Sequence, residues 1–178
     1  MAEKIMADTV ADQIAGWLYE KGITTAFGVV GGGNVALWDA ITRHSKIKLV
    51  CVHHEQAAAM AASYFYRTSG RVAACLCTTG AGSTNTLTGV VAAHMDSVPL
   101  LVISGNEASK YMGADTRVWG VQGYDSTGVV RKVTKLAYRV VNARQAVSWL
   151  ETALDLALLP RQGPVWVDLP KDVQNATV

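Results

Sequence analysis

The stretch "VAACLCTTGAGSTNTLTGVVAAHMDS", residues 72–97, indicates the fold because its hydrophobic pattern changes once. Residues 72–79 form a short, almost continuously apolar run, as in a strand that is buried on both faces. Residues 80–85 are small and rich in glycine, and residues 86–97 carry apolar side chains at helical spacing. A buried strand that turns tightly into a helix is the repeating unit of a parallel α/β sheet.

The same alternation of strand and helix continues along the chain. Apolar runs typical of buried strands occupy residues 24–30, 47–52, 98–104 and 163–170. Helical patterns occupy residues 6–18, 34–44, 55–68 and 146–158. Residues 106–128 are typical of a loop region with a short helix, and residues 129–140 fit either element. We therefore expect one α/β domain, a three-layer doubly wound sandwich around a mostly parallel six-stranded sheet.

Composition narrows the functional classes. Half of the 178 residues are hydrophobic and 17% are charged, which predicts that a partner covers part of the surface. The net charge of +2 with scattered basic residues argues against nucleic-acid binding. No apolar run reaches the roughly 18 residues of a membrane span, and the N-terminus lacks a signal-peptide core, so a cytoplasmic protein without membrane contact is expected. Cys51, Cys75 and Cys77 are expected to be buried, reduced thiols.

Three segments follow predicted strands directly, where a doubly wound sheet binds its ligands. They are "GVVGGGN" at residues 28–34, "HHEQ" at residues 53–56 and "TTGAGSTN" at residues 78–85. Glycines permit close backbone approach, and free N–H groups at a helix start can receive a ligand edge, although ordinary tight turns use the same residues. Asn85 stands where a dinucleotide fingerprint needs its third glycine, which disfavours a nucleotide binder.

The acid in "HHEQ" has three possible roles. A metal site is disfavoured because His53 and His54 are adjacent, would point to opposite faces of a strand, and belong to no H-E-x-x-H motif. Glu55 can instead favour the dipole of the helix that it begins. The third role is proton exchange with a ligand. The small apolar residues 57–62 would desolvate the carboxylate and let it share a proton with a ligand nitrogen.

Longer stretches of the chain resemble a known family. Residues 27–41, 52–106 and 163–174 are similar to the pyrimidine-binding (PYR) domain of thiamine-diphosphate enzymes, closest to the acetolactate-synthase-like branch. The resemblance rests on the ordered motifs H-E-Q, T-G-x-G-x-T-N, M-D-S-x-P and P-K-D-V-Q, and it covers about residues 5–175. It implies the thiamine-diphosphate-binding fold.

The resemblance also implies residue roles around the cofactor. Glu55 matches the glutamate that hydrogen-bonds N1′ of the aminopyrimidine and so helps to remove the proton from thiazolium C2. Gly31 and Gly32 match a turn near the thiazolium, although Val30 replaces the family's proline. The turn that packs near the pyrimidine is matched by Thr79, Gly80 and Asn85.

Two further positions are implied on the substrate side. Gln122 matches the glutamine of the family's F-Q-E-x-D segment, but Val121 and Gly123 replace its phenylalanine and glutamate. Those departures put acetolactate itself in question as the product. His53 matches a position that is usually basic or polar in the branch, and a buried structural histidine is its alternative role.

The family's other motifs are missing from this sequence. Relatives hold the diphosphate through Mg²⁺ on a second domain marked by G-D-G and N-N, and neither motif occurs here. The resemblance therefore implies that residues 1–178 are a single PYR-type domain without metal ligands of its own. The magnesium–diphosphate domain would belong to a separate subunit or to a longer protein, and a chain that starts with Met and ends just after its last strand favours the separate subunit.

The implied function is that of a pyrimidine-binding subunit or fragment of a thiamine-diphosphate-dependent enzyme. Such an enzyme is a lyase or transferase that decarboxylates or joins 2-oxo acids, active only with the diphosphate-binding partner. A non-catalytic assembly or regulatory domain is the alternative. Residues 55–68 and 86–97 carry more apolar side chains than one sheet face can bury, so we expect at least a homodimer, and a heterotetramer with the partner.

Overall fold

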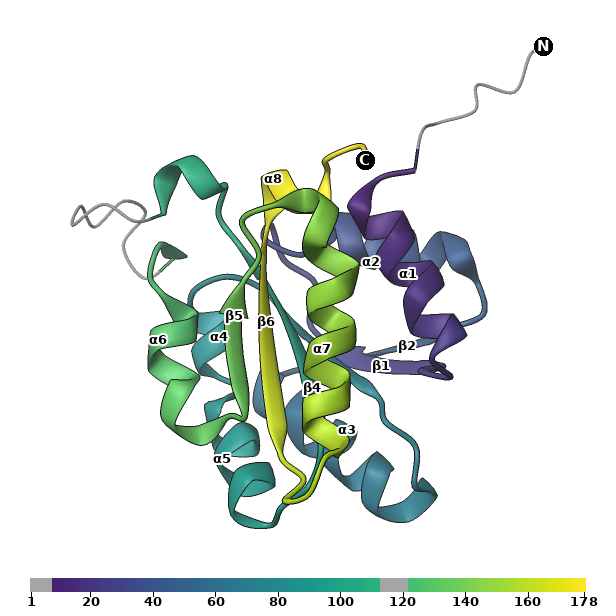
Figure 1. The fold of residues 1–178 in the computed structure, drawn as a ribbon, viewed down its shortest axis with the longest axis vertical. Coiled ribbons are helices and arrows are strands. Elements are labelled where there is room, and N and C mark those ends of the chain that lie inside the picture. Colours follow the sequence, from purple (N-terminus) through teal and green to yellow (C-terminus); the bar gives the residue numbers. More distant parts are fainter. Residues whose placement is uncertain (1–7, 113–121) are drawn as a thin grey trace.

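Six strands form one sheet in the computed structural model, which describes residues 8–112 and 122–178. The strands lie in the order β2-β1-β3-β4-β6-β5, and each neighbouring pair is parallel (Figure 1). Their bounds are β1 Thr25–Gly28, β2 Lys48–Cys51, β3 Ala74–Cys77, β4 Leu100–Asn106, β5 Leu136–Arg139 and β6 Pro164–Pro170. The predicted six-stranded sheet is confirmed.

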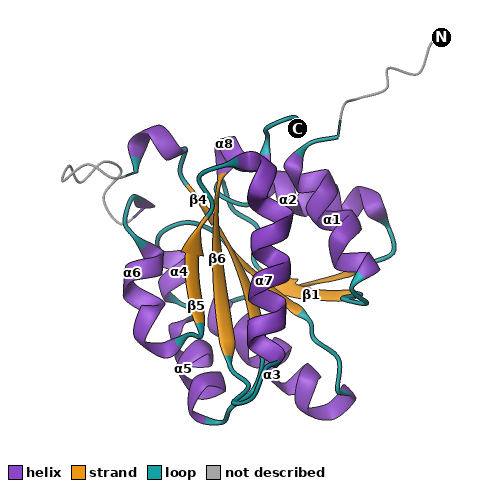
Figure 2. Cartoon of the chain, viewed as in Figure 1, coloured by secondary structure: helices purple, strands orange, loops and turns teal. Residues whose placement is uncertain are grey.

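Helices cover both faces of this sheet. Figure 2 shows the strands between two groups of helices, with α1, α2 and α7 on one face and α3, α5 and α6 on the other. The bounds are α1 Val10–Glu20, α2 Val35–His44, α3 Glu55–Ser69, α4 Ala81–Thr84, α5 Leu87–Met95, α6 Ser126–Val130, α7 Ala146–Leu158 and α8 Lys171–Gln174. The three-layer, doubly wound architecture is therefore confirmed.

Alternate side chains of the central strands pack into two separate hydrophobic cores, one on each face of the sheet. On β4, Leu101 and Ile103 pack with α1, α2 and α7, while Leu100 and Val102 pack with α3 and α5. Successive strand residues point to opposite faces, so a strand that is covered on both sides must be apolar throughout. This explains why the strands read as continuous apolar runs in the sequence.

Helix boundaries follow their local signals. Thr9 begins α1 with a capping box, in which its hydroxyl accepts from the Asp12 N–H and the Asp12 carboxylate accepts from the Thr9 N–H. Gly70 ends α3 in the left-handed conformation, with φ of 69°. The first helix was predicted to begin at Met6, which lies outside the described residues.

Several segments differ from the sequence expectation. The ambiguous residues 129–140 divide into the end of α6, a 3₁₀ turn η3 at Arg131–Val133, and the edge strand β5. Two short helices, α4 and α8, lie within motifs that were expected to be turns or strand ends. Cys51 is exposed on the edge strand β2, so its predicted burial was wrong, whereas Cys75 and Cys77 are buried and all three are free thiols.

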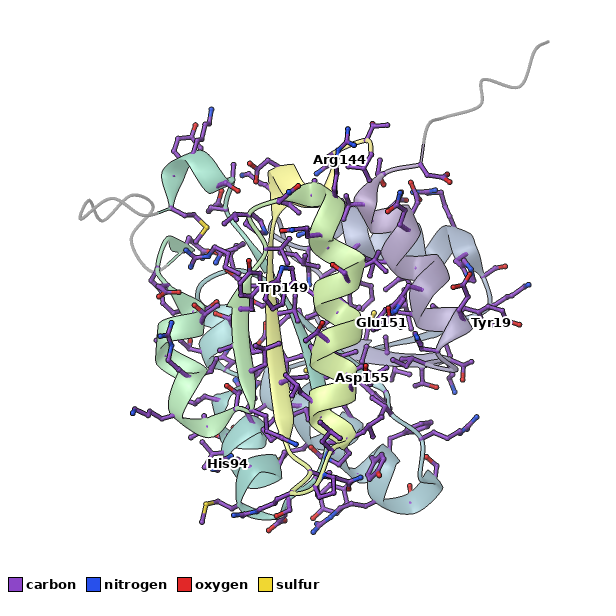
Figure 3. The ribbon with its side chains drawn as sticks, in the orientation of Figure 1. Tyr19, His94, Arg144, Trp149, Glu151 and Asp155 are labelled. Carbon is purple, nitrogen blue, oxygen red and sulfur yellow. The ribbon has the colours of Figure 1, made fainter. Side chains whose placement is uncertain are left out.

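Two acidic side chains are exposed on α7, Glu151 and Asp155, both labelled in Figure 3. The Glu151 carboxylate forms an ion pair with Lys21. In the described ranges, no helix combines the length and apolarity that crossing a membrane requires.

Candidate functional site

Three loops meet where β1, β2 and β3 end. β1 lies between β2 and β3, and the chain leaves it toward β2 but later continues from β3 toward β4, so the strand order reverses beside β1. Doubly wound proteins bind their ligands at such a point. The Gly33 N–H donates to Thr78 Oγ1 at 3.0 Å, which joins the loop after β1 to the loop after β3.

Glu55 lies at this meeting point as the first residue of α3. Its residue is only 8% exposed, and Asn85 Nδ2 donates to its Oε2 at 3.0 Å. The other oxygen, Oε1, has no hydrogen-bond partner in the described part of the chain. A Cβ added to Gly82 would lie 3.3 Å from that Oε1, so the turn after β3 passes directly beside the carboxylate.

The capping role belongs to the neighbouring residue rather than to Glu55. His54 is the N-cap of α3, and its Nδ1 accepts a hydrogen bond from the Gln56 N–H at 3.2 Å. The Glu55 side chain instead bonds to Asn85, which lies 30 residues further along the chain. The side-chain cap of α3 is therefore His54, and the Glu55 carboxylate joins α3 to the turn after β3.

His53 does not have the environment that was expected as its structural alternative. It is exposed, in the short connection between β2 and α3, so its predicted burial was wrong. Because β2 ends at Cys51, His53 and His54 lie beyond the edge strand rather than within the sheet. Exposure leaves His53 available to a ligand or a partner.

The glycine run after β1 is held tightly from several sides. Gly33 O accepts a hydrogen bond from Gln174 Nε2 at 2.6 Å, and a Cβ on Gly105 would lie 2.1 Å from the same carbonyl oxygen. Asn34 closes the loop from within, because its Oδ1 accepts from the Gly31 N–H at 2.8 Å. Close backbone packing of this kind explains why glycine is required at these positions.

Thr78 fits between the two glycine-rich loops. A Cβ on Gly31 would lie 2.6 Å from Thr78 Oγ1, and a Cβ on Gly82 would lie 2.5 Å from Thr78 Cγ2. A Cβ on Gly32, by contrast, would meet no atom within 4 Å, so open space lies beside it. The two loops therefore form one rigid surface with an open side at Gly32.

The turn after β3 also contacts the segment that follows the undescribed residues. Thr79 Oγ1 donates to the Gln122 carbonyl oxygen, which brings these two predicted site residues together. Gly80 has φ of 64° and ψ of −125°, a conformation that favours glycine. Val121, whose replacement of a family phenylalanine was noted, lies outside the described residues.

Sequence reasoning missed four of these positions. Thr78, Asn34, Gln174 and Tyr124 all bond to or pack against the two loops, yet none was assigned a role. Gln174 ends the motif P-K-D-V-Q and Tyr124 lies in "VQGYD", so both belonged to quoted segments. The contact between Tyr124 and Ser83 spans 41 residues and that between Gln174 and Gly33 spans 141, distances over which local spacing carries no signal.

A second polar cluster lies beside the site, under α6. Asp168 on β6 is fully buried, and its Oδ2 accepts from Arg139 Nε and from Asn106 Nδ2, each at 2.8 Å. Burial raises the pKa of Asp168, although the hydrogen bonds from Arg139 and Asn106 oppose it. Burial likewise raises the pKa of the Cys75 thiol to about 12, which makes that cysteine a poor nucleophile.

Comparisons of the sequence with known proteins identify its family. Residues 8–128 match the family model described as "Thiamine pyrophosphate enzyme, N-terminal TPP binding domain". The chain is 38% identical over 168 residues to an acetolactate synthase large subunit of Corynebacterium glutamicum, covering 94% of this chain and 26% of that protein. It is 34% identical to the large subunit of acetolactate synthase isozyme 1 of Escherichia coli, covering 94% of this chain and 29% of that protein.

A plant protein gives a similar match. The chloroplastic acetolactate synthase of Arabidopsis thaliana is 37% identical over 165 residues, with 93% of this chain and 24% of that protein covered. The chain therefore spans about a quarter of the length of the relatives that it matches.

Proposed function

The chain belongs to the thiamine pyrophosphate enzymes, matching their N-terminal TPP binding domain, and from this premise we propose that it forms the pyrimidine-binding half of such an enzyme's active site. The observation that carries the proposal is the position of Glu55. Its carboxylate is buried at the strand ends, has one oxygen bonded to Asn85, and has the other oxygen open toward the turn at Gly82.

The described residues fit the aminopyrimidine side of thiamine diphosphate. Such a ring needs an acceptor or proton donor at its ring nitrogen, which the Glu55 carboxyl group supplies. Open space beside Gly32 suits close approach of a flat ring. We assign the cofactor side of the site to Glu55, Asn85, Thr79 and the three glycines Gly31, Gly32 and Gly80.

When bound, thiamine diphosphate supplies the carbon nucleophile and electron sink for chemistry next to a carbonyl group. The chain's own contribution is a proton at a fixed place. Glu55 holds and exchanges this proton at Oε1, while Asn85 keeps Oε2 fixed by its amide hydrogen bond. Ala58 and Ala59, both with 0% exposure, line the start of α3 and keep water from the carboxylate.

The rest of the active site is assigned to a partner. We propose that a second domain or subunit binds the diphosphate through Mg²⁺, since the chain has neither G-D-G nor N-N. Within residues 8–112 and 122–178, no three His, Cys, Asp or Glu side chains are gathered to hold a metal ion. The substrate class proposed is a 2-oxo acid, supported by the names of the relatives, with His53 and Gln122 on the substrate side.

The outer faces of α3 and α5 support assembly with another copy. Tyr64 on α3 is 60% exposed and Met95 on α5 is 68% exposed. Val91 on α5 is also exposed. Large apolar side chains on two adjacent helices are typical of a protein interface. We propose a homodimer through this face, with an interface above about 1,000 Å² as stable dimers have, and a heterotetramer with the partner.

The test is the turnover of a 2-oxo acid by the assembled enzyme that contains Glu55→Gln. The amide keeps the shape of the side chain and can still accept from Asn85, but it cannot exchange a proton. Turnover should fall by about 10² or more, the scale for losing a positioned acid–base group. Glu151→Gln on the exposed face of α7 is the matched control and should keep full turnover. Near-normal turnover of Glu55→Gln would instead favour a non-catalytic assembly domain.

A further inference from the structure

Tyr124 reaches the turn that carries Asn85. The Ser83 and Tyr124 hydroxyls share a short hydrogen bond, in which either oxygen can be the donor. Both hydroxyls also lie within hydrogen-bond distance of the Gly80 carbonyl oxygen, Ser83 Oγ at 2.8 Å and the Tyr124 hydroxyl at 3.3 Å. The two hydroxyls and this carbonyl group therefore form one hydrogen-bonded cluster.

This turn sets the direction of the Asn85 side chain. Gly80 O accepts from the backbone N–H groups of Ser83 and Thr84, at 3.0 and 3.1 Å, and the Asn85 N–H donates to Ala81 O at 2.9 Å. The residues of α4 thus form one hydrogen-bonded turn that ends at Asn85. Because Asn85 Nδ2 holds Glu55 Oε2, a shift of this turn would move the carboxylate's only described hydrogen-bond partner.

Tyr124 is itself anchored to the sheet by charged side chains. The next residue, Asp125, accepts from Arg139 Nη2 at 2.9 Å, and Arg139 Nε donates to the buried Asp168 at 2.8 Å. Burial would raise the pKa of Asp125, but hydrogen bonds from Thr127 and the charge of Arg139 outweigh it and lower that pKa. Asp125 is therefore ionised at neutral pH, and Arg139 contacts both Asp125 and Asp168.

We propose that Tyr124 is a positioning residue for Glu55, which fixes the turn at residues 80–85 through Ser83, and that Asp168, Arg139 and Asp125 anchor Tyr124 to β6. This inference rests on the proposed role of Glu55 in cofactor activation. It places the Tyr124 hydroxyl in a series of hydrogen bonds that runs from β6 through the turn to the Glu55 carboxylate. Burial raises the pKa of Tyr124, so its hydroxyl keeps its proton at neutral pH.

The test is Tyr124→Phe in the 178-residue chain, which keeps the ring and removes only the hydroxyl. The readout is nuclear magnetic resonance of the Asn85 side-chain amide, together with hydrogen exchange of the backbone amides in the turn. We expect the Asn85 side-chain signals to shift. We also expect exchange at Ser83, Thr84 and Asn85 to rise about fivefold, the effect of losing one hydrogen bond, while amides of the strands keep their rates.

Tyr66→Phe is the matched control, since it also removes one phenol hydroxyl with a single described bond, accepted from Gln162 Nε2 at 3.0 Å. It should leave the Asn85 signals unchanged. Asp125→Asn tests the anchor and should produce the same pattern as Tyr124→Phe with a smaller amplitude. Unchanged Asn85 signals in Tyr124→Phe, or an equal change in Tyr66→Phe, would overturn the proposal.

A double variant separates a direct contact from general loosening. If Tyr124 acts through Ser83, adding Tyr124→Phe to Ser83→Ala should raise exchange no further than Ser83→Ala alone, which already removes the Ser83 hydroxyl from both of its contacts. Additive increases would contradict the contact. These measurements need no cofactor or substrate, so they stand even if Glu55→Gln keeps its turnover, and the failure of either proposal can be recognised separately.

Discussion

Two buried carboxylates of this protein, Asp168 and Glu55, have different kinds of partner. Asp168 is fully buried on β6 and is paired with the Arg139 guanidinium and the Asn106 amide. Glu55 is almost as buried at the start of α3, but its only described partner is the neutral amide of Asn85. Asp168 is paired with a cation inside the fold. Glu55 lies at the carboxyl ends of the strands, and its Oε1 has no hydrogen-bond partner among the described residues.

We propose that Asp168 serves stability and that Glu55 serves the reaction. A carboxylate bound by a guanidinium is part of a buried ion pair, and removal of the cation leaves an uncompensated charge. A carboxylate that is held only by a neutral amide belongs to no such pair, so it is available to a ligand. Substitutions at Arg139 should therefore affect folding first, and substitutions at Glu55 should affect the reaction first.

The largest expected effect on stability comes from Arg139→Met. This change keeps much of the side chain's volume but leaves Asp168 buried without its cation, so the free energy of unfolding at pH 7 should fall by about 3–5 kcal/mol. Urea denaturation measures the loss. Adding Asp168→Asn to the same chain should recover part of it, because the buried charge is then removed; no recovery would show that the charge is not the cause.

The same variant has a pH dependence of defined sign. Burial raises the pKa of Asp168 in the folded state, so that state binds a proton more readily than the unfolded chain does. Stability from this group is therefore greatest below about pH 4, where an unfolded Asp titrates, and falls as pH rises through the raised pKa. Arg139 opposes this rise, so its removal should raise the pKa of Asp168 further. The deficit of Arg139→Met should therefore be smaller at pH 5 than at pH 7, and an equal deficit at both would contradict this account.

Gly82→Ala tests how closely the turn after β3 packs against the Glu55 carboxylate. The new Cβ would lie 2.5 Å from Thr78 Cγ2 and 3.3 Å from Glu55 Oε1, so the Thr78 side chain or the turn after β3 must shift. Overpacking of this kind costs about 1–3 kcal/mol of unfolding free energy, and turnover of the assembled enzyme should fall with it. Gly16→Ala within α1 is the control, because its Cβ meets nothing within 4 Å and should stabilise the helix slightly.

The smallest expected effect belongs to His54→Ala. His54 caps α3 through its Nδ1, and loss of an N-cap side chain costs about 0.5–2 kcal/mol. Thermal unfolding should show this modest loss, while the Asn85 contact to Glu55 persists. If His54→Ala destabilised nothing and Glu55→Gln destabilised the chain by that amount, Glu55 would be the cap after all.

The sequence predicted the fold well because buried parallel strands leave a strong local signal. Residues 72–79 and 146–158 correspond closely to β3 and α7, since continuous apolar runs and helical spacing are read within one element. Residues 129–140 could not be divided, because the edge strand β5 follows a 3₁₀ turn and pairs on one side only. Exposure of Cys51 was missed for a similar reason, since nothing in β2 itself marks it as an edge strand.

The sequence predicted which residues belong to the site better than it predicted the contacts between them. Glu55 and the glycines at residues 31–32 follow strands directly, and strand ends are where this fold binds ligands. Three contacts of the site join segments that are distant in the sequence and meet only in the folded chain. They are the hydrogen bond between Asn85 and Glu55, the packing of Thr78 against Gly31, and the hydrogen bond between Tyr124 and Ser83. His54 as the cap was also missed, because an acid in the first turn and an imidazole before it are equally plausible from sequence.

The central claim is that Glu55 exchanges a proton with the bound cofactor. Its most direct test is the rate at which the C2 proton of thiamine diphosphate exchanges with deuterium in the assembled enzyme, followed by nuclear magnetic resonance after acid quenching, without substrate. Glu55→Gln should lower this rate by about 10² or more while the free energy of unfolding stays within about 1 kcal/mol of the parent chain. An unchanged exchange rate in a folded, cofactor-loaded Glu55→Gln enzyme would contradict the account.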